Sequence, residues 1–107
     1  MDMYDKKVII ATNSYKEKYY FEEQFNGIPL QVKNELIEIS VKLVQACGGV
    51  FVIGFYEDGT IYLEITAEES DLNYDEIGAK LEVNRLEKER EELWDSLKLW
   101  YNACYIN

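Results

Sequence analysis

The fold is decided by residues 49–67, which read Gly-Val-Phe-Val-Ile-Gly-Phe-Tyr-Glu-Asp-Gly-Thr-Ile-Tyr-Leu-Glu-Ile-Thr-Ala. The first half is almost entirely apolar, which is typical of a strand inside a sheet. Asp58 and Gly59 then predict a tight turn, because these residue types accept the positive φ angles that such turns require. From Thr60 onward apolar and polar residues alternate, which indicates a strand with one buried face. We therefore predict an antiparallel hairpin over residues 49–67.

A helix is predicted before this hairpin, over residues 29–46. Pro29 suits the first turn of a helix, where its missing N–H has no intrahelical partner to lose. One broad apolar face follows at helical spacing. It is formed by Val32, Leu36, Ile37, Ile39, Val41, Leu43 and Val44. Gly48 and Gly49 then end the helix, since glycine readily adopts the backbone conformation that follows a helix C-terminus.

The amino-terminal segment predicts a further strand and leaves one alternative open. A β-branched run within residues 7–12 favours a strand. Residues 17–21 contain three consecutive aromatic side chains and favour a hairpin partner for it. Ser14 and Glu17, however, also have the spacing of a capping box, which would start a helix instead. The sequence therefore leaves residues 15–26 open between strand and helix.

The carboxyl-terminal third, residues 74–104, predicts one long helix. Asn73 and Glu76 have the spacing of a capping box at its start. Its apolar stripe repeats every seven residues and has one polar member, Arg90. The stripe consists of Ala79, Val83, Leu86, Arg90, Leu93, Leu97, Trp100 and Cys104. A helix of this length would span ~45 Å, against ~30 Å for the diameter of a small domain. We therefore expect it to outrun its own core, so that it must bend, protrude or be covered by a second chain, and cover by a second chain is the leading expectation.

These elements predict a single α+β domain over residues 1–107. A small antiparallel sheet of three or four strands is packed on one side by helix 29–46 and by part of helix 74–104. The second chain that covers the long helix is expected to be another copy of the same protein. The expected contact between the copies is made by Leu86, Arg90, Leu93, Leu97, Trp100 and Tyr101.

Two interpretations of Arg90 are open. In the first, two antiparallel helices cross near Arg90 and pair it with Glu87 or Glu91 of the other chain, because an unpaired buried charge is not tolerated. In the second, Arg90 lays its methylenes on the apolar stripe and keeps its guanidinium in water.

The formal net charge of −10 limits the possible partners. Acidic residues exceed basic ones mainly within residues 57–95, whereas the two nearly balance in residues 1–56. An acidic surface repels phosphate, so we expect no nucleic-acid partner, and a basic protein surface is favoured instead. No apolar run is long enough to span a bilayer, and the start of the chain lacks the apolar region of a secretion signal. We expect no membrane association and a cytoplasmic location.

The sequence offers little catalytic chemistry. It contains no histidine, the side chain that most often acts as an acid or base near neutral pH. A spacing typical of a calcium loop occurs at Asp71, Asn73, Asp75 and Glu82. Glu76 stands where such a loop needs glycine for its sharp turn, and the start of a helix explains the same segment. We therefore expect no catalytic residues, no metal site and no cofactor.

The string Tyr74-Asp75-Glu76-Ile77-Gly78, after Gly48-Gly49 and the Asp58-Gly59 turn, resembles a family of short acidic bacterial proteins of unknown function. The resemblance covers nearly the whole chain and implies a bacterial, cytoplasmic protein without implying an activity. The order helix, Gly-Gly, strand, Asp-Gly, strand, helix is more loosely similar to roadblock-type regulatory domains. Those domains are non-catalytic dimers that bind other proteins, and the likeness to them is an analogy of element order.

The leading hypothesis is a non-enzymatic protein-interaction or regulatory module that self-associates through its carboxyl-terminal helix. One alternative is an acidic inhibitor or mimic that occupies the surface of a basic protein. Another is a small ligand-binding protein or hydrolase that uses carboxylates and tyrosines. The sequence identifies neither the partner nor the pathway.

Overall fold

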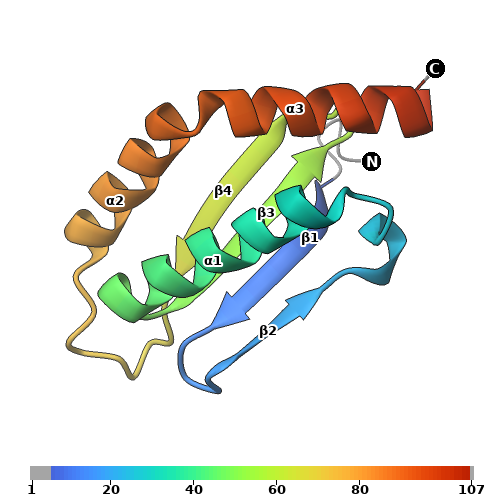
Figure 1. Cartoon of the computed structure of the whole chain (residues 1–107). Helices are drawn as coiled ribbons and strands as arrows, with labels where there is room; N and C mark the ends of the chain where they lie inside the picture. Colours follow the sequence, from blue (N-terminus) through green and yellow to red (C-terminus); the bar gives the residue numbers. More distant parts are fainter. Residues whose placement is uncertain (1–5, 107) are drawn as a thin grey trace.

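The structure is a computed structural model that describes residues 6–106. Within these residues, four strands form an antiparallel sheet in the order β2-β1-β3-β4 (Figure 1). They are β1 (Lys6–Asn13), β2 (Lys18–Phe21), β3 (Val50–Tyr56) and β4 (Ile61–Thr66). The apolar strand β3 lies inside the sheet, while β2 and β4 are its edges. The predicted sheet and its central hairpin are thus confirmed.

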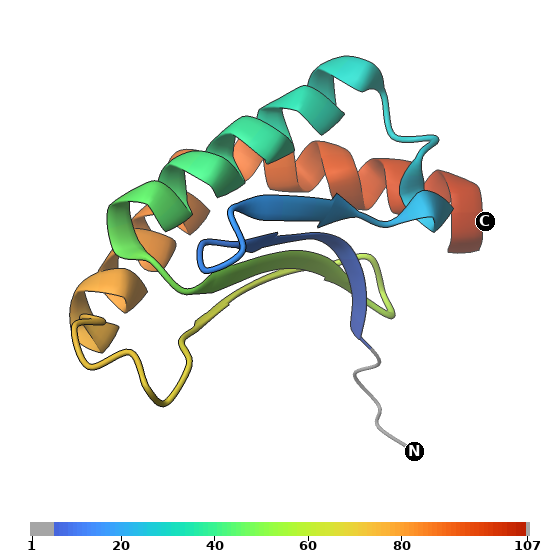
Figure 2. The ribbon, with the colours of Figure 1, turned by 90° about the horizontal axis from the view of Figure 1, so that it is seen from below.

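The helices lie on one face of the sheet, and the opposite face has no helix over it (Figure 2). They are α1 (Leu30–Cys47), α2 (Glu76–Glu89) and α3 (Glu91–Tyr101). A 3₁₀ turn (Glu23–Phe25) precedes α1, and a π-helical turn (Asn102–Ile106) follows α3. The predicted α+β class is confirmed. No helix in the described residues combines the length and the apolar character needed to cross a membrane.

The turn between β3 and β4 is set by the two residues that the sequence indicates. The backbone N–H of Thr60 donates to Asp58 Oδ1 at 2.9 Å. Hydrogen bonding from Thr60, first from its side chain and then from its backbone, lowers the pKa of Asp58. Gly59 has a φ of 88° and lies so close to Tyr101 that a Cβ would stand 2.9 Å from Cδ1 of that ring. The turn therefore needs glycine for both its backbone and its packing on α3.

In the segment that the sequence leaves open between strand and helix, residues 15–26, Lys18–Phe21 is a strand and Glu23–Phe25 is the 3₁₀ turn. Asn13 Oδ1 accepts hydrogen bonds from the backbone N–H groups of Tyr15, at 2.9 Å, and Lys16, at 3.2 Å. An asparagine that bonds the backbone two residues on stabilises a turn. The chain therefore reverses here, and β2 pairs with β1.

β1 contains a bulge at Ile9. Val8 and Ile10 pair with consecutive residues of β3, so Ile9 is an extra residue in the ladder. Ile9 and Ile10 are both fully buried, which strict alternation along a strand would not permit. The same offset turns Lys7 to the helical side of the sheet, where its Nζ lies 3.4 Å from the hydroxyl of Tyr101.

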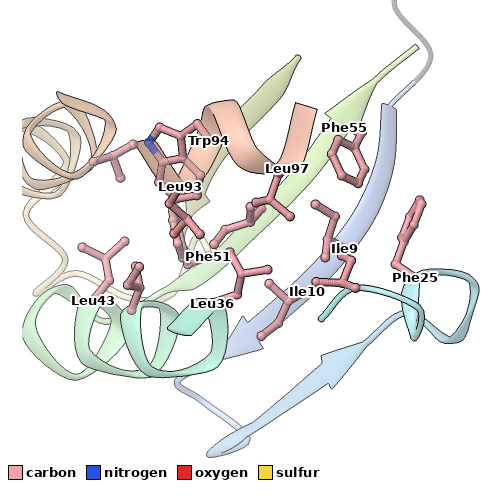
Figure 3. Close-up of a cluster of buried hydrophobic side chains, with 14 of the residues drawn as sticks. Ile9, Ile10, Phe25, Leu36, Leu43, Phe51, Phe55, Leu93, Trp94 and Leu97 are labelled. Atoms are coloured by element: carbon pink, nitrogen blue, oxygen red, sulfur yellow. The ribbon is translucent and has the colours of Figure 1, made fainter. Parts of the chain in front are cut away.

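The core fills the space between the sheet and the helices (Figure 3). Its labelled members come from the inner strands β1 and β3, from the helices α1 and α3, and from the 3₁₀ turn. They are Ile9, Ile10, Phe25, Leu36, Leu43, Phe51, Phe55, Leu93, Trp94 and Leu97. At one end the ring of Phe55 lies 4.6 Å from that of Tyr101 and 5.2 Å from that of Phe25, measured between centroids. Burying each large apolar side chain contributes roughly 1.5–3 kcal/mol.

The prediction of one continuous helix over residues 74–104 is wrong. The helix begins at Glu76 with Asp75, not Asn73, as its N-cap, and it is interrupted at Arg90. Figure 1 shows α2 and α3 meeting at an angle, so that α3 crosses above the ends of the strands. The break lets both halves of the apolar stripe reach the same core, which a straight rod of that length could not do.

Candidate functional site

The predicted interface residues are mostly used inside the subunit. Of the six, three on α3 are buried and two more are half-buried against the core. The buried ones are Leu93, Leu97 and Tyr101, and the half-buried ones are Leu86 and Trp100. The apolar stripe is therefore covered by its own subunit, which removes the reason for expecting a second chain on it. Self-association itself stays a prediction.

Arg90, the exposed member of that set, is paired within the chain. Its backbone has φ −118° and ψ 32°, outside the helical range. Its Nη1 atom donates to Glu35 Oε2 of α1 at 3.2 Å. Both side chains are more than 40% exposed, so the ion pair contributes at most about 1 kcal/mol. Arg90 therefore has an acidic partner without Glu87 or Glu91 of another chain. The spacing of residues in the sequence could not identify Glu35 as that partner, because it lies on a different helix.

The break at Arg90 leaves backbone carbonyls that a side chain satisfies. The last carbonyls of a helix have no intrahelical partner. The Arg90 N–H donates to Leu86 O at 3.2 Å, and the Trp94 indole Nε1 donates to Glu87 O at 3.0 Å. Trp94 is 92% buried, so its ring packs in the core while its N–H holds the end of α2. A tryptophan one turn after the break thus joins α2 to α3.

The face of the sheet without helices is apolar along its middle. Strand register places Val50, Val52 and Tyr56 of β3 on this face, beside Val8 and Ala11 of β1. All five are half-buried. The polar residues of this face lie on the two edge strands and at the two ends of β1, with Glu64 and Thr66 on β4, Lys18 on β2, and Lys6 and Asn13 on β1. We call this surface, with its apolar middle and polar edges, the open face.

Tyr62 gives the open face part of its shape. It pairs with Gly54, and its ring occupies the space where a Cβ at Gly54 would stand. Tyr62 is consequently only 7% exposed although no helix covers it. Its ring lies 5.2 Å from that of Tyr56, and Lys6 Nζ stands 5.3 Å above it. Desolvation, followed by the charge of Glu64, raises the pKa of Tyr62.

A groove of about 380 Å³ opens between the β1–β2 hairpin and the carboxyl-terminal half of α1. Val41 and Val44 of α1 and Tyr19 of β2 line it, together with the amide side chain of Gln45. Thr12 of β1 also lines it and is only 3% exposed. Within residues 6–106, the Thr12 hydroxyl has no hydrogen-bond partner. Sequence reasoning missed this groove, because its two sides, residues 12–19 and 41–45, come from separate parts of the chain.

The carboxylates with calcium-loop spacing are used by the loop itself. Asp75 Oδ1 accepts from the Gly78 N–H at 2.9 Å and caps α2. Asp71 Oδ2 accepts from the Tyr15 hydroxyl at 2.8 Å, and the Glu68 N–H donates to that hydroxyl at 3.2 Å. Desolvation and then the bond to Asp71 raise the pKa of Tyr15. Across residues 6–106, acidic and cysteine side chains form no group of three or more that could hold a metal ion.

Comparison with known proteins finds the relatives of this chain at the level of a family. No curated protein and no solved structure matches it. A family model matches residues 6–107, which is nearly the full length of the sequence. The prediction of an uncharacterised family is thereby confirmed. The chain belongs to DUF6145, a family of unknown function.

Proposed function

We propose that this chain is a non-enzymatic protein-interaction module that forms a homodimer through the open face of its sheet. The observation that carries the proposal is that β3 is apolar on both of its faces. An antiparallel sheet with one face in water ordinarily alternates apolar and polar residues, whereas a strand covered on both faces is continuously apolar. Burial of Val50 and Val52 would therefore be favourable, and no helix of the chain packs on the face of the sheet where they lie. The sequence resemblance supports a bacterial, cytoplasmic setting.

The size of the open face suits a dimer. Four strands spaced ~4.8 Å apart, of which β2 has four residues and the others six to eight, present a surface of at most roughly 19 × 23 Å. Side chains roughen such a surface, so two of them packed together would bury on the order of 1,000 Å² in total, which is where specific interfaces begin. Its apolar middle and polar edges also follow the usual distribution of an interface.

The charges at the edges favour a two-fold arrangement. Lys18 lies on the β2 edge of the open face, and Glu64 lies on the β4 edge, where Lys6 Nζ is 3.7 Å from its carboxylate. A two-fold axis parallel to the strands places β2 of one copy over β4 of the other. Lys18 would then face the strand that carries Glu64, twice per dimer, which favours this orientation over those that bring like charges together.

The proposed absence of catalysis is supported by how the polar side chains are used. Two pairs of groups that an active site could employ bond one another instead, namely Tyr15 with Asp71 and Arg90 with Glu35. Neither pair lies in a deep pocket, and each pair holds two elements of the fold together.

Sedimentation velocity on three proteins tests the proposal. The wild type is expected to be a dimer at micromolar concentration. Val52→Lys places an ammonium group in the middle of the open face, where an unpaired buried charge costs several kcal/mol, so a monomer is expected. Leu99→Lys is the matched control, because Leu99 is 72% exposed on the outer side of α3, and this variant is expected to stay dimeric.

Circular dichroism establishes that each variant is folded before its mass is interpreted. A monomeric wild type, or a Val52→Lys protein that remains dimeric, refutes the proposed interface. Dissociation by Leu81→Lys instead of Val52→Lys would move the interface to the outer face of α2, where Leu81 is 63% exposed.

A further inference from the structure

We propose that the break at Arg90 is a hinge through which two copies of this chain exchange α3. In the exchanged dimer, α2 and α3 of each copy form one continuous helix, and each α3 packs against the sheet of the other copy. This association is separate from the open-face dimer, because here the partner supplies part of the hydrophobic core. Exchange of an identical element is a low-cost route to a dimer, since both forms contain the same core contacts.

The residues around the break favour an uninterrupted helix. Residues 84–95 contain no glycine and no proline, and most of them are glutamate, lysine, arginine or leucine, which are strong helix formers. A helix commonly ends beside a glycine and begins with a side-chain cap. At this break the residue between the two helices is Arg90, and α3 begins without a hydrogen bond from a capping side chain. The local sequence therefore contains no signal that separates α2 from α3.

Backbone hydrogen bonding also favours the continuous form. α2 ends at Glu89 and α3 begins at Glu91, and the first N–H groups of a helix have no partner within it. In a continuous helix the Glu91 N–H would donate to Glu87 O. That carbonyl instead accepts from the Trp94 indole at 3.0 Å. Straightening the chain therefore replaces a bond between side chain and backbone with regular helical bonds.

The packing of α3 keeps a single chain bent. Leu93, Leu97 and Tyr101 are at most 8% exposed, and Figure 3 shows Leu93 and Leu97 pointing from α3 into the core. If one chain straightened alone, these side chains would enter water, at a cost that grows with the apolar area exposed. A second copy removes this cost, because its core presents the surface that α3 already fits. The partner in the exchange is therefore another copy of this chain.

The charges of the hinge allow two copies to meet there. In an exchanged dimer both chains cross between the subunits at their hinges, so the two hinges lie close together. Residues 57–84 contain nine acidic residues and one basic residue, and two such segments would repel each other. Residues 85–92 contain four acidic and three basic residues, so their charges nearly balance. The segment that has to face its own copy is thus the one without a strong acidic excess.

Two substitutions at the hinge test the exchange. Arg90→Ala and Arg90→Gly both remove the ion pair with Glu35, so the difference between them reports the helix preference at this position. Alanine favours a helix interior over glycine by about fivefold, and the dimer contains two hinges, so Arg90→Ala should dimerise at a concentration about 30-fold lower. Ser96→Ala and Ser96→Gly are the matched control. Ser96 is exposed within α3, which is helical in both forms, so these two variants should dimerise equally.

The four variants are made in a Val52→Lys background, which removes the open-face dimer. They are incubated over a range of concentrations in urea just below the unfolding midpoint, where α3 leaves the core and returns. Size-exclusion chromatography then separates monomer from dimer, and circular dichroism establishes that each variant is folded.

An isotope-filtered nuclear Overhauser experiment identifies the exchanged helix in the wild type, so it does not depend on the folding of any variant. ¹³C-labelled and unlabelled chains are unfolded together and refolded at millimolar concentration. The rings of Phe55 and Tyr101 lie 4.6 Å apart between centroids. In the exchanged dimer this contact joins two chains, so a signal between labelled and unlabelled rings is expected. The open-face dimer does not give it, because both rings are at most 2% exposed in the core on the helical side of the sheet.

A refolded wild type without this signal between chains overturns the exchange, whether it is monomeric or associates through another surface. Equal dimerisation of Arg90→Ala and Arg90→Gly, or an equally large difference between the two Ser96 variants, also overturns it. The open face is tested in native protein at micromolar concentration and the exchange after refolding, so the two proposals can fail separately.

Discussion

We predict that the indole N–H of Trp94, which bonds across the break between α2 and α3, stabilises the folded protein. Trp94 donates to Glu87 O at 3.0 Å, whereas Trp100, on the same helix, makes no indole hydrogen bond within residues 6–106. Replacing either tryptophan by benzothienylalanine keeps the two fused rings and exchanges the N–H for sulfur. At Trp94 the part-buried hydrogen bond to the Glu87 carbonyl is lost, which costs about 1–1.5 kcal/mol, and at Trp100 the expected cost is close to zero.

The same bond can be measured with ordinary substitutions. Trp94→Phe also removes roughly 40 Å² of the 150–250 Å² that an aromatic side chain buries. At about 25 cal/mol per Å² this adds ~1 kcal/mol, so the total expected loss is about 2–2.5 kcal/mol. Trp100→Phe is expected to lose at most ~1 kcal/mol, because it gives up area alone.

Thermal and urea unfolding followed by circular dichroism, at one fixed protein concentration, measure these losses. For a chain of 107 residues each kcal/mol lowers Tm by roughly 4–5 °C. Trp94→Phe should therefore melt roughly 10 °C below the wild type. If the two benzothienylalanine proteins have the same stability, the indole bond does not hold the break and the account given of it is wrong.

Three further predictions concern other parts of the molecule. Gly54→Ala forces a Cβ into the ring of Tyr62 and should cost about 1–3 kcal/mol in urea unfolding, and adding Tyr62→Leu should recover most of that loss; no recovery would contradict the assigned contact. The lowered pKa of Asp58 means that its contribution to stability is present above the ordinary pKa of aspartate and is lost as pH falls through the lowered value, so Asp58→Asn should flatten the acid limb of Tm against pH. Iodoacetamide should modify the exposed Cys104 faster than Cys47, because burial raises the pKa of the Cys47 thiol, and mass spectrometry of digested protein would detect equal rates if this reasoning fails.

The elements of this fold follow from local chemistry. Asp58 and Gly59 fix a turn by themselves, and the alternation after Thr60 fixes which face of β4 is buried, so residues 49–67 could be predicted without knowledge of the rest. The helix over residues 29–46 was likewise given by its apolar face and its terminal glycines, and α1 ends within one residue of the expected position.

The features that sequence reasoning missed depend on contacts between distant segments. A continuous helical pattern passes through Arg90, yet Glu35 in α1 and the indole of Trp94 stabilise a break there. Helix propensity depends on residue type and on near neighbours, so it does not include partners from distant parts of the chain. The groove beside β2 was missed for the same reason, because Thr12 and Val41 lie on the same groove only in the folded chain. The sequence does contain a signal for the open face. Both faces of β3 carry apolar residues, which is typical of a strand that is covered on both sides.

The bulge at Ile9 decides whether β1 contacts the end of α3. If Ile9 instead paired with Gly54 in a regular ladder, Val8 would oppose Phe55 and turn inward, and Lys7 would oppose Tyr56 and turn outward. The ammonium group of Lys7 would then leave the phenol of Tyr101, ninety-four positions along the sequence. A one-residue phase shift in the first strand thus joins it to α3, and removing Ile9 altogether would preserve that contact because Val8 would still oppose Gly54.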